Sequence, residues 1–174
     1  MSTGMIDDEK LIAAAKRLRT EDAPTEFSQQ DKSASADAIE NFLDTYELIE
    51  IDDLKVVPAD KNTSERMTIS GVSVSIRPDA YLEDPITGDI KGAVKLHFPK
   101  TTPLNEISAE YVATAMKVYI EQEKKSAVVD YKKCYVIDVS TKQVTHAPKA
   151  YKRKMNDITA ACEEIEARWK RGGG

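Results

Sequence analysis

The chain has 174 residues, 41% of them hydrophobic and 32% charged, a composition typical of one soluble domain with a sizeable core. No run of eighteen apolar residues occurs, so a membrane-spanning helix is not expected. The formal net charge of −5 argues against nucleic acid as the main partner, since non-specific affinity comes largely from neutralising phosphates.

The charge is uneven along the chain. Residues 1–110 hold 12 basic and 22 acidic groups, whereas residues 111–174 hold 13 basic and 8 acidic groups. The C-terminal third is therefore the candidate for a surface that faces phosphates.

The N-terminus leads directly into a charged helical pattern and carries no secretory signal. Cys134 and Cys162 have no spacing typical of metal ligands, so we expect free thiols in a reducing compartment. These features predict a cytoplasmic protein.

In chain order, residues 6–18 have the periodicity of an amphipathic helix, and residues 19–32 have the composition of a linker. We expect residues 1–32 to form an appendage that offers a surface to a protein partner. Ser35 is the predicted N-cap of a second helix, whose apolar residues follow the i, i+3, i+4, i+7 pattern.

Residues 54–57 predict a short strand, and Met67 begins another. The apolar parity changes after Ser70 and Gly71, which indicates a bulge or a tight turn there. Three strands are thus predicted before the next helix.

Residues 72–98 predict a β-hairpin with apolar side chains at even positions and ionisable ones at odd positions. The connection ends in Gly88, which suits the left-handed position of a three-residue hairpin loop. Closing the turn there opposes odd-numbered residues across the strands: Glu83 with Lys91, Tyr81 with Ala93, Asp79 with Lys95, and Arg77 with His97.

A helix is expected at residues 105–122, strands at 134–139 and 144–146, and a last helix at 149–171, with a flexible tail at 172–174. Four basic residues open the last helix: Lys149, Lys152, Arg153 and Lys154. We expect an α/β fold in which residues 33–171 form one domain, a central mixed β-sheet flanked by helices. Its core order is α-β-β-β-α-β, with extra helices at the N- and C-termini.

Pro78-Asp79 near the end of one strand and Lys95 in the middle of the next resemble the motif of the PD-(D/E)xK nuclease superfamily. This superfamily includes restriction endonucleases, λ exonuclease and RecB-type nucleases, and the resemblance covers residues 33–145. It implies a restriction-endonuclease-like fold in which Asp79 binds Mg²⁺ or Mn²⁺ and Lys95 stabilises the attacking water.

The motif departs from the superfamily at one position, because Ala93 stands where the second acid is expected. Some members supply that acid from the following helix, which makes Glu110 the preferred candidate over Glu106. The preceding helix offers two further acids, Glu40 and Glu47, and Glu40 is the predicted metal ligand.

Two functions follow from the resemblance. The first is a Mg²⁺-dependent nuclease-like domain that hydrolyses DNA phosphodiester bonds, with Asp79, Lys95 and Glu110 as catalytic residues and Asp79, Glu110 and Glu40 as metal ligands. The alternative is a catalytically inactive relative of the same fold that binds protein or nucleic acid. The sequence does not indicate the oligomeric state.

Overall fold

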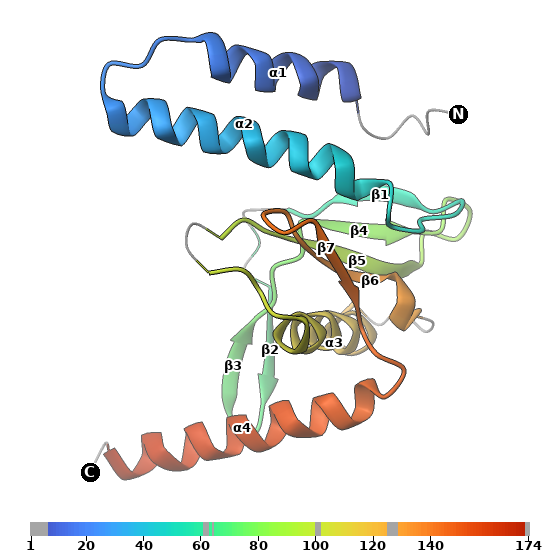
Figure 1. Ribbon diagram of the computed structural model, residues 1–174. Helices are drawn as coiled ribbons and strands as arrows, with labels where there is room; N and C mark the ends of the chain where they lie inside the picture. The colour runs from blue at the N-terminus through green and yellow to red at the C-terminus, as the bar shows by residue number, and fades with distance from the viewer. Residues whose placement is uncertain (1–6, 61–62, 64, 100–101, 125–128, 173–174) are drawn as a thin grey trace.

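The computed structural model describes residues 7–60, 63, 65–99, 102–124 and 129–172 (Figure 1). Four α-helices and a short 3₁₀ helix, η1, occur within these residues: α1 Asp8–Thr20, α2 Glu26–Tyr46, α3 Glu106–Gln122, η1 Tyr131–Lys133 and α4 Tyr151–Gly172. Seven strands accompany them: β1 Lys55–Pro58, β2 Arg66–Ile69, β3 Val72–Ser75, β4 Ala80–Glu83, β5 Ile90–His97, β6 Cys134–Asp138 and β7 Gln143–His146. Among these helices, none has an apolar stretch of the length needed to cross a bilayer.

The central sheet has the strand order β1-β4-β5-β6-β7. Its neighbours are antiparallel except for β5 and β6, which run parallel and are joined through α3. Strands β2 and β3 form a separate hairpin, and β3 contacts α4 (Figure 1). The prediction of an α/β fold with a central mixed sheet flanked by helices, plus further helices at both ends, is confirmed.

Both faces of the central sheet are buried at its centre. One face, with Tyr81, Ala93 and Val136, packs under α3 in the larger core cluster. The other face, with Leu82 and Val94, packs against α2 in a second cluster. The prediction that the odd positions of the hairpin form a polar face is therefore wrong at its centre, because Tyr81 and Ala93 are core residues.

The predicted long strand that begins at Val72 is divided. Ser70 and Gly71 both have positive φ, 47° and 85°, and form the tight turn that closes the β2–β3 hairpin. Pro78 has no backbone N–H, and residues 76–79 belong to no strand before β4 begins in the central sheet. The period-two alternation of apolar residues continues through residues 76–79, so the sequence gives no sign that the strand is divided there.

The register between β4 and β5 follows the prediction over most of its length, with Tyr81 opposite Ala93. A bulge after Leu82 then places Glu83 opposite Ile90, so the predicted pairing of Glu83 with Lys91 is wrong. Gly88 has a φ of 75°, the left-handed conformation predicted for it.

The predicted linker at 19–32 is mostly helical. Helix α2 begins at Glu26, because the Thr25 hydroxyl accepts from the Ser28 backbone N–H while the Ser28 hydroxyl bonds back to Thr25. Ser35 lies inside this helix and caps nothing; its hydroxyl donates to the Asp31 carbonyl oxygen. The expected division after residue 32 thus falls within α2. At the other end of the chain, Gly172 belongs to α4, and residues 173–174 lie outside the described residues.

Helix α1 lies along α2 and is held there at both ends (Figure 1). Tyr46 donates a hydrogen bond to Asp8, and Arg19 forms ion pairs with Asp37 and Glu40, each at 2.6 Å. The expected appendage is therefore one half of an antiparallel helix pair.

Cys134 is fully buried at the start of β6, and burial raises the pKa of its thiol to about 12. We expect a Cys162→Ser variant to react slowly with a thiol reagent at pH 8 when folded and rapidly in urea, because the thiolate is the reactive species. Absorbance of the released chromophore measures the rate. Equal rates in the folded and unfolded protein would contradict this assignment.

Candidate functional site

Asp79 and Lys95 lie side by side where β4 begins and β5 approaches its end. Lys95 Nζ donates to Asp79 Oδ2 at 2.9 Å, and the backbone N–H of Leu96 donates to the same oxygen at 2.7 Å. The Asp79 N–H donates to the Val94 carbonyl oxygen at 2.8 Å, which continues the β4–β5 ladder by one residue. The predicted juxtaposition of this carboxylate and this ammonium is therefore present.

The pair is partly accessible, with 39% of the Asp79 side chain and 32% of the Lys95 side chain exposed. Within the described residues, both bonds to the Asp79 carboxylate end on Oδ2. Lys95 is partly neutralised by its carboxylate partner, which weakens its attraction for a phosphate.

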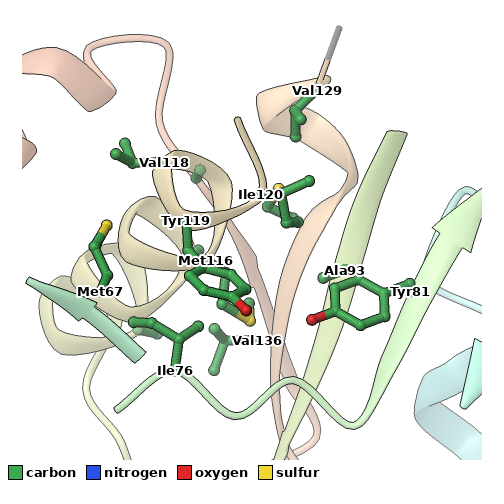
Figure 2. Packing of buried hydrophobic residues seen from close by; sticks show 14 of the residues in the cluster. Met67, Ile76, Tyr81, Ala93, Met116, Val118, Tyr119, Ile120, Val129 and Val136 are labelled. Carbon is green, nitrogen blue, oxygen red and sulfur yellow. The ribbon is translucent and has the colours of Figure 1, made fainter. Parts of the chain in front are cut away.

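Ala93, at the motif position of the second acid, is completely buried opposite Tyr81. Figure 2 shows both side chains in the core together with Met116 and Tyr119 of α3. A carboxylate here would be enclosed by apolar groups, at a large desolvation cost.

Glu65 is a buried acid that the sequence analysis missed, and it reaches the same face of the sheet. The Tyr81 hydroxyl donates to its carboxylate, and Lys124 Nζ lies 2.6 Å from its other oxygen. Burial, and then the bond to Glu65, raise the pKa of Tyr81. Glu65 is thus engaged by a hydroxyl and an ammonium, which leaves it poorly suited to replace the missing acid.

Glu110 does not join Asp79. It lies on α3 facing α4, where its carboxylate is 2.7 Å from Lys154 Nζ. This hydrogen bond raises the pKa of Lys154, whose ammonium also lies 4.5 Å from the centre of the Tyr111 ring. The helix presents Glu110 to its neighbouring helix, where it joins α3 to α4.

Glu40 is also engaged elsewhere. It lies on α2 towards α1, and hydrogen bonds from Arg19 lower the pKa of its carboxyl group. Both predicted metal-site partners of Asp79 therefore serve helix packing instead.

A divalent metal ion of the kind expected needs several oxygen ligands from neighbouring side chains. Within the part of the chain that the structure describes, no group of three His, Cys, Asp or Glu side chains is close enough to hold one. The predicted donor set is reduced to Asp79, so these residues do not fit the magnesium site that the resemblance implies.

Asp138 is a second buried acid that sequence analysis missed, although a lone carboxylate in the run Cys134–Asp138 was a visible signal. It lies at the carboxyl end of β6, opposite His97 of β5. Its oxygens accept from the backbone N–H groups of Leu104, Ser140 and Thr141 and from the Ser140 hydroxyl. Asp138 thus anchors the chain segment before α3 to the end of the sheet.

A pocket of about 820 Å³ opens between α2 and the carboxyl ends of β5 and β6, on the sheet face opposite Asp79 and Lys95. The first half of α2 extends past the sheet at this end (Figure 1). We call this pocket the α2 groove. Its apolar lining includes Leu11, Phe27, Ala34, Phe42, Leu96 and Phe98. Phe27 is 74% exposed and Phe98 56% exposed, so two aromatic rings at the groove face solvent.

The charged side chains that line the α2 groove are both acidic, Asp31 and Asp37. Helix α2 as a whole carries five carboxylates, of which Asp37 and Glu40 are paired with Arg19 and Asp44 is paired with Lys142. The groove is therefore mainly an apolar surface.

Comparison with known proteins gave no match: no protein-family model, no curated protein and no solved structure resembles the chain closely enough to be assigned.

Proposed function

We propose that this chain is a catalytically inactive relative of the PD-(D/E)xK fold that functions as a protein-binding module through the α2 groove. The order of its core elements supports the fold assignment. Helix α2, strands β1, β4 and β5, helix α3 and strand β6 can be matched to an α-β-β-β-α-β order when the β2–β3 hairpin is treated as an insertion after β1. The adjacency of Asp79 and Lys95 supports it further.

The observation that carries the inactive assignment is the environment of Ala93. The missing acid is replaced by a methyl group that is fully buried against the core, and the candidate substitutes Glu110 and Glu40 are paired with Lys154 and Arg19. Among the described residues, Asp79 is the one predicted metal ligand left at this site, and its carboxylate is already paired with Lys95.

Protein is favoured over DNA as the partner by charge and by surface chemistry. The α2 groove is lined mainly by apolar side chains, and its charged lining residues, Asp31 and Asp37, offer no positive charge to a phosphate backbone. Exposed aromatic residues such as Phe27 and Phe98 are typical anchors of protein interfaces.

The Mg²⁺-dependent nuclease is the second candidate, and it rests on the 2.9 Å contact between Asp79 and Lys95. That contact is the arrangement that phosphodiester hydrolysis by this superfamily would use. The two candidates differ in whether Asp79 binds a metal ion.

A metal titration distinguishes the binding module from the Mg²⁺-dependent nuclease. Bound metal raises the melting temperature by an amount set by its concentration relative to Kd. For the binding module we expect no rise with Mg²⁺ or Mn²⁺ at millimolar concentration and no cleavage of single- or double-stranded DNA. Scanning calorimetry and a gel assay measure the two outcomes.

The variants Asp79→Ala and Asp89→Ala complete the test. Asp89 is a matched control, since it also pairs with a lysine of β5, Lys91, at 3.2 Å. A metal-dependent rise that disappears in Asp79→Ala and persists in Asp89→Ala would establish the nuclease candidate and overturn the proposed module.

A further inference from the structure

Helix α1 lies outside both hydrophobic core clusters of the molecule. Among the described residues, neither cluster includes a side chain of α1, whereas α3 and α4 both contribute to the larger one. The buried residue of α1 is Ala15, and its main packing partner is α2, along which it lies (Figure 1). A helix of 13 residues is marginally stable by itself in water, so α1 depends on this contact.

The polar contacts that hold α1 to α2 are open to solvent. Arg19 pairs with Asp37 and Glu40, and these three side chains are 40%, 57% and 50% exposed. The hydroxyl of Tyr46 donates to the carboxylate of Asp8 at the other end of α1. Exposed ion pairs stabilise a protein weakly, because water solvates both partners once they separate. The attachment of α1 is therefore weak compared with the packing of α3 in the main core.

Helix α1 also forms part of the α2 groove. Leu11 contributes to the apolar lining, and Arg19 neutralises Asp37, one of the two carboxylates of that lining. Separation of α1 from α2 would remove the Leu11 side of the groove and uncover the face of α2 around Ala36, which is now fully buried. The apolar surface of α2 would then become larger.

Helix α2 has an attachment of its own. Its residues Ala38 and Phe42 pack against the second core cluster, beneath which lie Leu82 and Val94 of the sheet. The position of α2 on the sheet therefore does not depend on α1.

We propose that α1 is a strap on α2, which detaches while the rest of the fold stays intact and thereby enlarges the apolar surface of the α2 groove. Local opening of this kind occurs where few buried apolar contacts hold an element in place. The inference rests on the proposed function and adds its regulation, since the state of α1 sets how much of α2 a protein partner can reach.

Hydrogen exchange of the full chain, followed by mass spectrometry, measures the opening. We expect the amides of α1 to exchange much faster than those of α3, and Arg19→Gln to accelerate exchange in α1 about threefold without affecting α3. Arg168→Gln is the matched control, because it breaks an equally exposed ion pair, with Glu164 of α4, and should leave α1 unchanged. Protection of α1 equal to that of α3 would show that α1 opens only in global unfolding and would overturn the proposal.

A second pair of variants tests what the strap covers. Ala15 is 1% exposed, so Ala15→Leu should force α1 away from α2 and raise the fluorescence of Nile red, an uncharged apolar dye. Ala13→Leu makes the same change at an exposed position of α1 and should leave the dye signal almost unchanged. Both variants should keep a cooperative unfolding transition, because α1 belongs to neither core cluster.

Two results with these variants would overturn the strap. Equal dye signals in Ala15→Leu and Ala13→Leu would mean that α1 covers no apolar surface of α2. Loss of the cooperative transition in Ala15→Leu would mean that α1 folds as one unit with the sheet. Either result leaves the α2 groove available to a protein partner, and the metal titration tests catalytic inactivity separately.

Discussion

Replacement of Gly92 by alanine is expected to lower the free energy of unfolding by about 3 kcal/mol or more. A Cβ atom at this position would lie 2.1 Å from the carbonyl oxygen of Lys133 and 2.6 Å from its carbonyl carbon. Both atoms belong to the backbone at the end of η1, so no side-chain rotation relieves the overlap. Strand β5 or the start of β6 must move, and the parallel β5–β6 pairing begins one residue later, at Ala93 and Cys134.

Urea denaturation followed by circular dichroism measures this loss, provided that the m-value is unchanged. Gly88→Ala is the matched control. Gly88 has a φ of 75°, and no atom lies within 4 Å of the place that an alanine methyl group would take, so it should lose only about 1 kcal/mol from backbone strain. Equal losses in the two variants would mean that η1 does not press against β5.

The role of Gly92 shows where prediction from the sequence ends. Period-two alternation placed Asp79 opposite Lys95 because strand register is a local property, fixed by parity and by the turn. The need for glycine at position 92 depends on a carbonyl group of Lys133, far away in the chain. The local periodicity of the sequence gives no information about this close contact between Gly92 and the Lys133 carbonyl group.

The same limit explains the misplaced metal ligands. The helical pattern correctly placed Glu110 on the helix that follows the lysine strand. It did not reveal that Lys154 of α4 would pack against this face and bind the carboxylate. Similarly, Glu40 was expected near the metal site, but α1 packs along α2 and brings Arg19 to its carboxylate. In both cases the competing partner is a cation brought in by tertiary packing.

The extent of α2 also decided whether the groove could be predicted. Because residues 19–32 were interpreted as a linker, the prediction contained no helical surface that extends past the sheet. The capping box at Thr25 and Ser28 extends the helix at its N-terminal end, and this places Phe27 and Ala34 at the groove opposite Phe98. Polar residues such as Gln29 and Gln30 are compatible with helix, so composition alone did not exclude this outcome.

Asp138→Asn is expected to lower the free energy of unfolding by about 3 kcal/mol at neutral pH. Asp138 is 3% exposed, and both of its oxygens accept hydrogen bonds: Oδ2 from the Leu104 N–H at 2.6 Å, and Oδ1 from Ser140 and Thr141. An asparagine keeps one acceptor and must direct its NH₂ group at a donor. One anchored segment, before α3 or after β6, then loses its partner.

The pH dependence of this loss identifies its cause. Burial acts to raise the pKa of Asp138, but the hydrogen bonds from Ser140, Leu104 and Thr141 outweigh it and lower the pKa below its usual value of 3.8. A carboxyl group with a lowered pKa in the folded state stabilises the protein fully above its unfolded-state pKa. That stabilisation is lost as the pH falls through the folded-state value. The difference between wild type and Asp138→Asn should therefore be constant above about pH 5 and become smaller below about pH 4.

Denaturant titrations from pH 7 to pH 3 measure both quantities, and Asp84→Asn is the control. Asp84 also accepts two backbone N–H groups, from Ile86 and Thr87, which lower its pKa, but it lies in a solvent-accessible turn where water can replace a lost acceptor. We expect this variant to lose at most about 1 kcal/mol.

A difference between wild type and Asp138→Asn that stays constant down to pH 3 would show that the shape of the side chain, and not its charge, holds the segments before α3 and after β6. If charge holds them, Asp138 fixes the position of the segment that leads into α3, the helix that packs over Tyr81 and Ala93. The burial of Ala93, on which the inactive assignment rests, would then depend in part on this carboxylate.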